Sequence, residues 1–331
     1  MFVKHFFYPG NKIHIMDTVK YSIIIPHKNS PSLLTRCVAS IPKRDDLQVI
    51  VVDDNSDPSI VDFDNFPIKN DENTIIVFDK SGKGAGRARN IGLEKATGEK
   101  IIFADADDFF NYCFNEILDE YKNDTSDIVF FNASSCDSKT YVNHYAHGKF
   151  RNELFEGYLK NPQLYEYYLR YECGAPWGKI IRKDLIENNH VKFEESIINN
   201  DTRFSYMTGH LAKSIQVDQR AIYCYTYSPS SISFTMNDEK YLTHMHIIAQ
   251  QIVFCKPYRQ NFSSYKSYPF NYLRKKLVIL HQANKKDLYN ECLKILDSYG
   301  LGKELKKAVQ KRILYIKVGG LVLRLARRIK K

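Results

Sequence analysis

The sequence of 331 residues lacks several features that would place it in common classes of protein. Its seven cysteines are odd in number and form no C-x-x-C pair, so neither a zinc site nor a disulfide framework is predicted. Reduced thiols in a cytoplasmic protein are the simplest interpretation. Nowhere do 18 apolar residues follow one another, which argues against a membrane-spanning helix. Lys4, His5 and Pro9 interrupt the apolar start of the chain, which is therefore not typical of a signal peptide.

Excess positive charge is absent from most of the chain. The net charge is +10, and residues 301–331 account for all of it with eleven Lys or Arg and one Glu. The other 300 residues are balanced, with 37 basic and 37 acidic side chains. A protein whose main body binds nucleic acid would carry a basic face there. We therefore expect no nucleic-acid partner.

Short apolar runs are present, and they alternate with helical patterns in the first half of the chain. Helical spacing occurs at 32–41 and 87–96. The runs predict buried strands at residues 21–25, 48–52, 74–78, 101–104 and 127–131. This alternation predicts an α/β fold with a mostly parallel sheet that helices cover on both faces.

The pattern changes after residue 150. We predict an aromatic-rich helix over 154–171, a loop at 174–179 with the only tryptophan, a strand or helix at 180–188, a loop at 193–201, a strand at 221–226, and helices at 240–254, 268–281, 286–298 and 302–331. The predicted organisation is an extension at 1–19, a domain at 20–235 with halves at 20–131 and 150–235, and a helical C-terminal region at 236–331. Either Met1 or Met16 could be the natural start.

Polar segments follow the carboxyl ends of the predicted strands. They are Asn29, Asp53–Asp54, Gly82–Gly86 and Asp105–Asp108. Because parallel strands place these ends along one edge, where α/β proteins bind ligands, the four segments should converge on one crevice.

The acids after the strand at 101–104 are candidates for a metal site. Asp105, Asp107 and Asp108 offer hard oxygen ligands, which suit Mn²⁺ or Mg²⁺ bound together with substrate phosphates. The alternative is a solvated acidic turn that caps a helix over 110–122.

Two other segments suit a nucleotide. Asp53 and Asp54 could accept hydrogen bonds from a base or ribose, although Asp-Asn-Ser-Asp-Pro is also rich in turn-forming residues. The Gly82–Gly86 spacing is G-x-G-x-G, which differs from the dinucleotide-binding pattern. Lys83, Arg87 and Arg89 beside these glycines could still approach a diphosphate at a helix N-terminus, the alternative being a solvated basic loop.

An ordered set of motifs resembles the family 2 glycosyltransferases, which are inverting enzymes with the GT-A fold. The set comprises the strand with Pro26-x-x-Asn29, Val52-Asp-Asp-x-Ser56, Ala88-Arg-Asn-x-Gly-x-x-x-Ala-x-Gly98, and Asp105-Ala-Asp-Asp108. Trp177-Gly-Lys179 resembles the acceptor-side segment of the family, and Asn200-Asp201 stands where Glu-Asp is usual. The resemblance covers about residues 20–235.

This resemblance implies a role for each motif. The metal and the donor diphosphate would lie at Asp107 and Asp108, and Asp201 would be the catalytic base. Asp105 opens the motif, and its alternatives are a metal ligand or a residue that only shapes the turn. The nucleotide-sugar side would comprise Pro26, His27, Asn29, Asp53, Asp54, Lys83, Arg89 and Asp107, and the acceptor side Trp177, Lys179 and Asn200. His27-Lys28 replaces the usual apolar-Tyr pair, and a lone Trp also suits a core position.

The resemblance further implies metal-dependent, inverting transfer of a sugar from a nucleotide sugar, with UDP favoured, to a glycan or lipid-linked glycan. The expected product is a surface polysaccharide or glycolipid. Two alternatives stay open at this point. One is a nucleotidyltransferase on a similar sheet, and the other is an inactive subunit that binds nucleotide sugars.

The end of the chain and two histidines complete the predictions. Within residues 312–331, apolar side chains fall on one helical face and basic ones opposite, which favours an anionic membrane surface over packing on the fold. We therefore expect a cytoplasmic protein, peripheral on the inner face of the cell membrane. His244 or His246 could join the metal, although both could be ordinary surface histidines.

Overall fold

The structure is a computed structural model that describes residues 19–67, 69, 73–143, 145–228, 236–259 and 267–329. The side chains of 145–148 and 317–329 are outside this description. The predictions for the extension that contains Met1 and Met16, and for the side chains of most of the basic tail, therefore lie outside the described residues.

Half of the central sheet is parallel, as predicted. Strand β1 (Tyr21–His27) pairs with β2 (Leu47–Asp54) on one side and β4 (Lys100–Phe103) on the other, and β3 (Thr74–Asp79) pairs with β2. Helices α1 (Pro31–Ala39) and α2 (Ala85–Lys95) pack on opposite faces, because alternate β1 side chains belong to two different hydrophobic clusters. Every residue of β1 and β2 is consequently buried.

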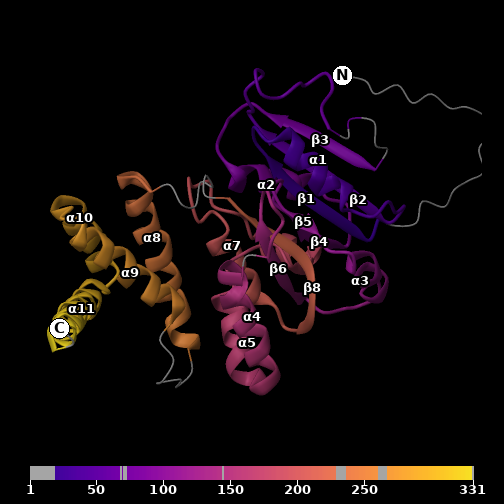
Figure 1. The fold of residues 1–331 in the computed structure, drawn as a ribbon. Helices are drawn as coiled ribbons and strands as arrows, with labels where there is room; N and C mark the ends of the chain where they lie inside the picture. The colour runs from indigo at the N-terminus through magenta and orange to yellow at the C-terminus, as the bar shows by residue number, and fades with distance from the viewer. Residues whose placement is uncertain are drawn as a thin grey trace, which may run out of the picture.

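The other half of the sheet is mixed. The full order is β3-β2-β1-β4-β7-β6-β8-β5 (Figure 1). Strand β7 (Lys179–Arg182) runs antiparallel to β4 and to β6 (Ile128–Asp137). Strand β8 (Ile215–Tyr227) is parallel to β6 and antiparallel to β5 (Phe109–Phe110). The predicted strand at 127–131 therefore exists, but a later strand separates it from β4, and local periodicity carries no information on such pairing.

Several helices differ from their predicted bounds. The predicted helix at 154–171 is two helices, α4 (Tyr145–Lys160) and α5 (Pro162–Tyr171). The break occurs because Pro162 has no N–H for a helix interior, and the Asn161 side chain caps α5 by accepting a hydrogen bond from the Leu164 N–H.

Other differences concern short elements. Residues 109–110 form β5, so α3 (Phe114–Glu120) is shorter than the predicted 110–122. Residues 180–188 are divided between β7 and α6 (Lys183–Asn188). Helix α7 (Thr202–Leu211) follows Asp201 and was not predicted.

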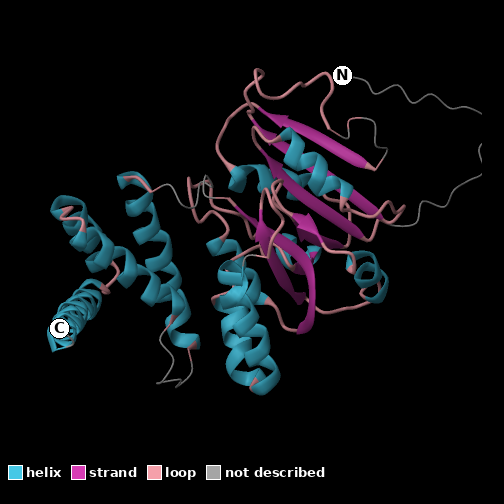
Figure 2. Ribbon diagram, viewed as in Figure 1, coloured by secondary structure: helices cyan, strands magenta, loops and turns pink. Residues whose placement is uncertain are grey.

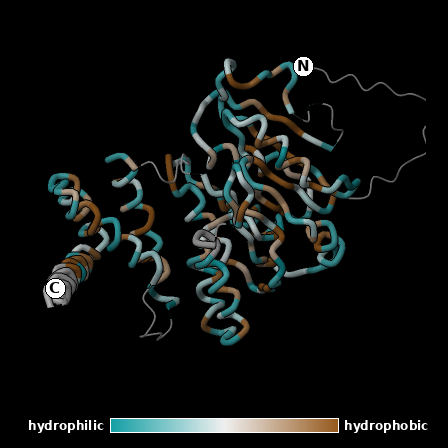
Figure 3. Tube along the Cα trace, in the orientation of Figure 1, coloured by the Kyte–Doolittle hydropathy of each residue, from teal (hydrophilic) through white to brown (hydrophobic). Residues whose placement is uncertain are grey.

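The C-terminal helices form a separate hydrophobic cluster beside the sheet (Figure 2). They are α8 (Asp238–Cys255), α9 (Tyr268–Gln282), α10 (Lys286–Ser298) and α11 (Gly302–Ile329), with the short η1 (Lys256–Tyr258) after α8. Within the described part of the chain, no helix is long and apolar enough to cross a membrane. Figure 3 shows hydrophobic residues along the sheet strands and hydrophilic ones in many of the loops. The division at residue 235 stays a prediction.

Candidate active site

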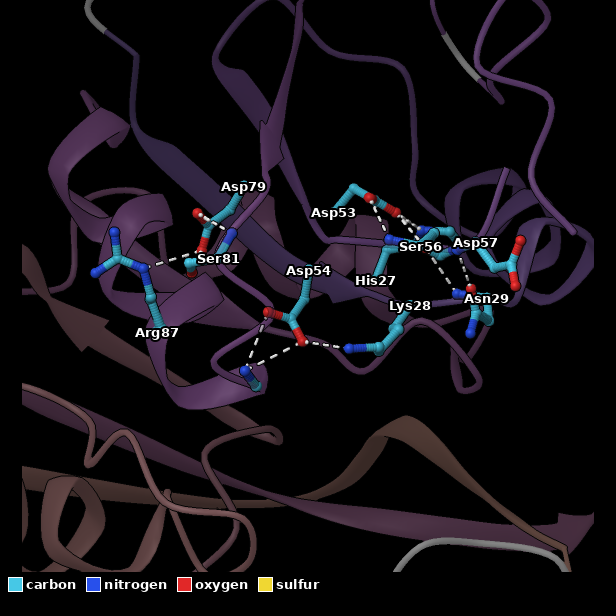
Figure 4. A network of polar contacts seen from close by, with 11 residues as sticks. His27, Lys28, Asn29, Asp53, Asp54, Ser56, Asp57, Asp79, Ser81 and Arg87 are labelled. Atoms are coloured by element: carbon cyan, nitrogen blue, oxygen red, sulfur yellow. Dashed lines mark hydrogen bonds and ion pairs between the residues drawn. The ribbon is translucent and has the colours of Figure 1, made fainter. Parts of the chain in front are cut away.

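The ends of the parallel strands meet at one edge, as the sequence predicts. In the register of the sheet, His27 of β1 lies opposite Asp53 of β2, and Asp54 lies opposite Asp79 of β3. Figure 4 shows the polar contacts that link these strand ends.

His27 and Asp53 hold the edge together from inside. The Asp53 carboxylate is fully buried and accepts hydrogen bonds from His27 Nδ1 (2.8 Å), the Ser56 hydroxyl (2.5 Å) and the Ser56 N–H (3.0 Å). Since the Ser30 N–H donates to His27 Nε2 (3.2 Å), the imidazole is neutral, with its hydrogen on Nδ1. Burial acts to raise the pKa of Asp53, but the hydrogen bonds from His27 and Ser56 outweigh it and lower that pKa. Both residues therefore support the loop, and their expected direct contact with a nucleotide does not fit their buried positions.

Asp54 joins the neighbouring loops at the same edge. Its carboxylate accepts hydrogen bonds from the Gly84 N–H (3.0 and 3.1 Å) and lies 3.2 Å from Lys28 Nζ. Gly84 has φ +91°, a conformation that glycine adopts most readily. Lys28 is half exposed, so it is the cation at this position that can reach a ligand.

Asn29 fixes the turn after β1, and Pro26 lies within the strand. The Asn29 backbone has φ +51°, its N–H donates to Ser56 Oγ (2.8 Å), and its Oδ1 accepts from the Asp57 N–H (2.7 Å). Pro26 is buried and pairs with Val52. These two predicted nucleotide-side residues therefore shape the edge of the sheet from which Lys28 projects.

Asp108 faces the protein interior rather than the crevice. It is 1% exposed, its Oδ2 accepts from the Tyr223 hydroxyl (2.7 Å), and its Oδ1 accepts from the Thr226 N–H (2.7 Å). The Tyr223 hydroxyl also accepts from the Asp105 N–H (2.9 Å). Burial, followed by the charges of Asp107 and Asp105, raises the pKa of Asp108. Strand β8 thus clamps the acidic loop through Tyr223 and Thr226.

Asp107 is the exposed acid of the loop. Its side chain reaches solvent even though protein atoms crowd around it, and this partial burial raises its pKa to about 6, with the Asp105 charge adding to the effect. Arg36 of α1 donates to the Asp107 main-chain oxygen, which fixes the backbone and leaves the carboxylate free. Asp105 and Asp107 therefore carry neighbouring like charges. Arg89 pairs with Asp105 on one side, and a further cation near Asp107 would stabilise both carboxylates.

The residues present fit a Mn²⁺ or Mg²⁺ ion held by few protein ligands. Among the described residues, no three His, Cys, Asp or Glu side chains gather as a closed metal site. One or two carboxylates with substrate phosphates are the usual arrangement for Mg²⁺. Asp107 and Asp105 suit this arrangement, whereas both oxygens of Asp108 already accept hydrogen bonds. Asp105 accepts a hydrogen bond from Arg89 through Oδ1 alone, so it is better placed than Asp108 to bind a metal ion.

His244 and His246 lie on α8 and contact other residues. His244 is buried with its ring 4.7 Å from the Tyr272 ring, and burial lowers its pKa to about 3. His246 Nδ1 lies 3.4 Å from the Tyr299 hydroxyl. Both histidines therefore contact residues of the C-terminal region, and these contacts do not support a role in the metal site.

Arg89 connects the acidic loop with the loop before α7. It is 5% exposed, its Nη2 donates to Asp105 Oδ1 (2.6 Å), and its Nη1 donates to Asn200 Oδ1 (2.8 Å). Its guanidinium also lies 5.4 Å from the centre of the Phe193 ring. Arg89 thus links the two loops through its terminal nitrogens, and its contact with a diphosphate stays a prediction. Lys83 is exposed and lies 3.6 Å from Glu195, so it remains available.

Asp201 stands at the N-terminus of α7. Aspartate at this position commonly caps the helix, but the side chain of Asp201 makes no capping hydrogen bond. Burial raises its pKa, the Asp105 charge adds to this effect, and Arg89 and Lys179 oppose it. A carboxylate with a raised pKa and no capping duty is suited to accept a proton. Asn200, the residue before Asp201, accepts a hydrogen bond from Arg89, which also donates to Asp105.

The predicted acceptor-side residues are mostly packed. Lys179 is 1% exposed and donates from Nζ to the Cys173 carbonyl (2.9 Å), and burial lowers its pKa to about 8. A direct acceptor contact does not fit this position. Trp177 is half-buried and stacks on Tyr223 at 4.9 Å and on Tyr225 at 5.9 Å, so it braces the residue that clamps the acidic loop.

Sequence reasoning missed Lys28, Arg36, Tyr223 and Thr226. The alternation at 221–226 predicted a strand but not its partners, which come from a loop more than a hundred residues earlier. No local pattern signals such contacts.

Comparisons with known proteins agree with the fold and the motifs. The model for "Glycosyl transferase family 2" matches residues 22–187, half of the chain, and the chain belongs to this family. It is 27% identical over 224 residues to a Bacillus subtilis (strain 168) protein named as a glycosyltransferase, EpsH; the match covers 66% of this chain and 63% of that one. It is 28% identical over 205 residues to the "Cholesterol galactosyltransferase" of Borreliella burgdorferi, covering 57% of this chain and 55% of the relative. The chain thus spans less than two thirds of these relatives.

Solved structures with the same fold include the TarS 1-349 fragment from S. aureus in complex with UDP-GlcNAc. It has a TM-score of 0.55 and 22% identity, with 86% of this chain and 92% of that chain covered. The mannosyltransferase PcManGT from Pyrobaculum calidifontis, in complex with GDP-Man and Mn²⁺, has a TM-score of 0.50 and 16% identity over 92% of this chain and 80% of that one. At these identities the likeness establishes the GT-A fold, which is the predicted fold class.

Proposed function

We propose that this protein transfers a sugar from a UDP-sugar to a hydroxyl group of a glycan or lipid-linked glycan, with inversion at the anomeric carbon, in the synthesis of a surface polysaccharide or glycolipid. One observation carries the proposal. Through Arg89, the loop with the partly exposed Asp105 and the exposed Asp107 is joined to the segment that bears Asp201. Such a transfer needs a pair of acids that can bind a metal for the donor diphosphate. It also needs a carboxylate that is free to accept a proton.

The donor side of the crevice would hold the nucleoside diphosphate. Asp105 and Asp107 would bind Mn²⁺ or Mg²⁺, which supplies Lewis-acid stabilisation of negative charge on the leaving diphosphate. Lys28 and Lys83, both exposed cations on loops at this edge, are placed to meet the nucleotide. Asp54 orients Lys28 through their contact of 3.2 Å.

The acceptor side would supply the nucleophile. Asp201 takes the proton of the acceptor hydroxyl as that oxygen attacks the anomeric carbon from the face opposite the diphosphate. Arg89 keeps the acidic loop and the base segment at a fixed separation, which reduces the orientational entropy lost in the transition state. Tyr223, held by Trp177, keeps the acidic loop from moving when a charged donor enters.

We further propose that residues 312–331 bring the protein to the cytoplasmic face of an anionic membrane. Support comes from the sequence, in which basic and apolar residues alternate with helical period. A lipid-linked acceptor would be met there.

Identification of the leaving product tests the proposed reaction. The purified chain would be incubated with a panel of UDP-sugars, Mn²⁺ and membrane extract as a source of acceptors. Release of UDP that depends on Asp201 and Asp107 is the expected result. Release of pyrophosphate would instead indicate a nucleotidyltransferase, and metal-dependent UDP binding without turnover of any donor would indicate a binding subunit.

A further inference from the structure

A cavity lies away from the candidate active site, between α5 and the C-terminal helices. Its volume is about 630 Å³, within the range of small-molecule sites. The walls come from α5, α8, η1, α9 and α11, and residues 260–266 are outside the description. In Figure 1, α8 stands between α5 and the other C-terminal helices.

Basic side chains outnumber acidic ones in the lining of this cavity. Five basic side chains line it, against two acids, Glu172 and Glu304; the basic residues are Lys256, Arg259, Arg274, Lys311 and Arg312. In the part of the chain that the structure describes, no ion pair neutralises Arg274, Lys311 or Arg312. Such a cluster is suited to a phosphate group, since Arg presents paired donors to phosphate oxygens.

A buried acceptor without a partner also lines the cavity. Glu172 is 5% exposed, and its Oε2 accepts from the Tyr268 N–H at 2.9 Å. Its Oε1 is buried and has no hydrogen-bond partner among the described residues. Burial raises the pKa of Glu172 to about 7, although hydrogen bonds from the Tyr268 N–H and the Ser267 side chain and the charge of Arg259 oppose this effect. A buried carboxylate oxygen left in this way costs stability unless a donor such as a hydroxyl group reaches it.

Aromatic side chains complete the lining. Phe270 and Tyr315 contribute ring surfaces, and Tyr315 is 70% exposed. The apolar face of a sugar or polyol chain packs well on such rings. The cavity thus offers cations for a phosphate, a carboxylate for a hydroxyl group and aromatic rings for a carbon skeleton. These three features suit a phosphorylated sugar or polyol.

We propose that this cavity binds a phosphorylated sugar or polyol, with its phosphate at Arg274 and Lys311 and a hydroxyl group donating to Glu172 Oε1. The inference goes beyond the proposed transfer reaction and does not depend on it. Two sources share this chemistry: a free phosphorylated carbohydrate and the headgroup of a glycophospholipid.

Calorimetric titration of the full chain tests the proposal with glucose 6-phosphate, glucose and inorganic phosphate. We expect glucose 6-phosphate to bind more tightly than either of the other two. The double variant Arg274→Gln with Lys311→Gln should weaken this binding tenfold or more, because it removes two charged donors. The matched control, Lys303→Gln with Lys306→Gln, changes two exposed lysines of α11 outside the cavity and should leave binding unchanged.

A third variant separates the sugar contact from the phosphate contact. Glu172→Met should remove the preference for glucose 6-phosphate over inorganic phosphate while phosphate binding persists. Equal binding of the two ligands by the parent chain, no saturable binding at all, or unchanged binding by the Arg274/Lys311 variant would each overturn the proposal. Should Glu172→Met fail to fold, the double variant still decides.

Vesicles distinguish the two sources. Phosphatidylcholine vesicles with and without phosphatidylinositol would be sedimented with a chain that ends at residue 317, which keeps the cavity residues. Binding that needs phosphatidylinositol and is lost in the Arg274/Lys311 variant would assign the lipid headgroup. Binding of soluble glucose 6-phosphate alone would assign the free carbohydrate. Because no donor is present in these assays, and Asp201→Asn should bind as the parent does, failure of the transfer reaction would not affect the outcome.

Discussion

Asp201 combines three properties that a single residue needs to act as a base. It begins a helix without capping it, its pKa is raised by burial, and its neighbour Asn200 is tied to Arg89. The raised pKa of Asp201 brings its proton affinity closer to that of the attacking hydroxyl in the transition state. Because Asp201 makes no capping hydrogen bond, its carboxylate can turn toward an acceptor.

Asp201→Asn should therefore abolish most transfer and spare donor binding. We expect UDP release to fall by about 10²- to 10⁴-fold, the usual contribution of a general base. Thermal shift with UDP and Mn²⁺ should be unchanged, because the variant keeps shape and loses only the proton acceptor. Glu116→Gln, at an exposed acid on α3, is the control and should retain parent activity. Parent-like turnover by Asp201→Asn would remove it from the mechanism.

Asp107 predicts a pH dependence for metal binding. Its pKa is about 6, raised by burial and by Asp105, so it is protonated below that pH and ionised above it. Mn²⁺ competes with the proton, so the apparent affinity for Mn²⁺ should rise as the pH increases through about 6 and then level off. Titration of bound Mn²⁺ by electron paramagnetic resonance at several pH values measures this directly.

The Asp107→Asn variant should be titrated with Mn²⁺ in the same way as the parent chain. It should bind Mn²⁺ at least tenfold more weakly near neutral pH, since a second carboxylate alone is a poor site. Its residual binding should also lose the step near pH 6. If the parent and the variant gave the same pH profile, the titrating group would not be Asp107.

For single residues, the sequence alone indicated which acids could form the site but not which role each acid has. Asp105, Asp107 and Asp108 look alike as letters, and only their neighbours separate them. Asp108 is satisfied by Tyr223 and Thr226 from β8, whereas Asp107 has no such partners. His27 and Asp53 illustrate the same point, because a pair of polar residues at a strand end looks the same in sequence whether it faces a ligand or its own loop.

Between elements, Arg89 is the main connection of the crevice. It extends from α2 to the acidic loop after β4 and to the loop before α7. The planar guanidinium donates to Asp105 and to Asn200 from two nitrogens at a fixed angle. A lysine ammonium group cannot reproduce this geometry.

Arg89→Gln should destabilise the fold and disconnect its two halves. Removal of one member of a buried pair costs about 3 kcal/mol, and the partly exposed Asp105 makes that an upper value. Arg87→Gln is the comparison variant, two residues earlier on α2. Its side chain is 34% exposed, so its ion pairs with Asp79 and Glu195 should contribute little to stability. Urea unfolding of the three proteins compares them, and similar midpoints for both variants would argue against the connection.

Close contact of α2 with the loop at 194–200 gives another test. A Cβ at Gly86 would lie 2.0 Å from the Glu194 carbonyl oxygen and 2.9 Å from Asn200 Cβ. Gly86→Ala should therefore push this loop away from α2 and lower the rate of UDP release by tenfold or more, since small displacements of catalytic groups are costly. Gly174→Ala, where a Cβ would meet nothing within 4 Å, should behave as the parent. Unchanged rates in Gly86→Ala would show that the loop position is not critical.

Elements with strong local signals were predicted well. The strands of the parallel half and the helices at 240–254, 268–281 and 286–298 exist close to their predicted bounds, because apolar periodicity and burial agree there. The prediction failed where a long-range contact decides the structure. Phe109 and Phe110 continue a helical pattern in sequence, yet pairing with Cys224 and Tyr223 makes them a strand.

For the whole molecule, the C-terminal region ends in a basic helix, α11, which packs on α9 and α10. Deletion of residues 318–331 removes apolar and basic residues of the tail and keeps the residues that line the cavity. If the tail binds membranes, the shortened chain should no longer sediment with anionic vesicles at moderate salt, because each basic residue near the surface contributes about 1 kcal/mol. A variant with Lys303→Gln and Lys306→Gln, which keeps the tail, should still sediment. Equal sedimentation of shortened and full chains would exclude the tail as anchor.

The clamp from Tyr223 and Thr226 has a consequence for how the protein comes into being. The acids of the loop leave the ribosome more than a hundred residues before the strand that satisfies Asp108. Until β8 is in place, Asp108 would be a buried carboxylate without its donors, so the donor side of the crevice cannot reach its final geometry during synthesis of the first half. A fragment that ends at residue 187, where the family match ends, contains every acid of the loop and should bind UDP and Mn²⁺ poorly.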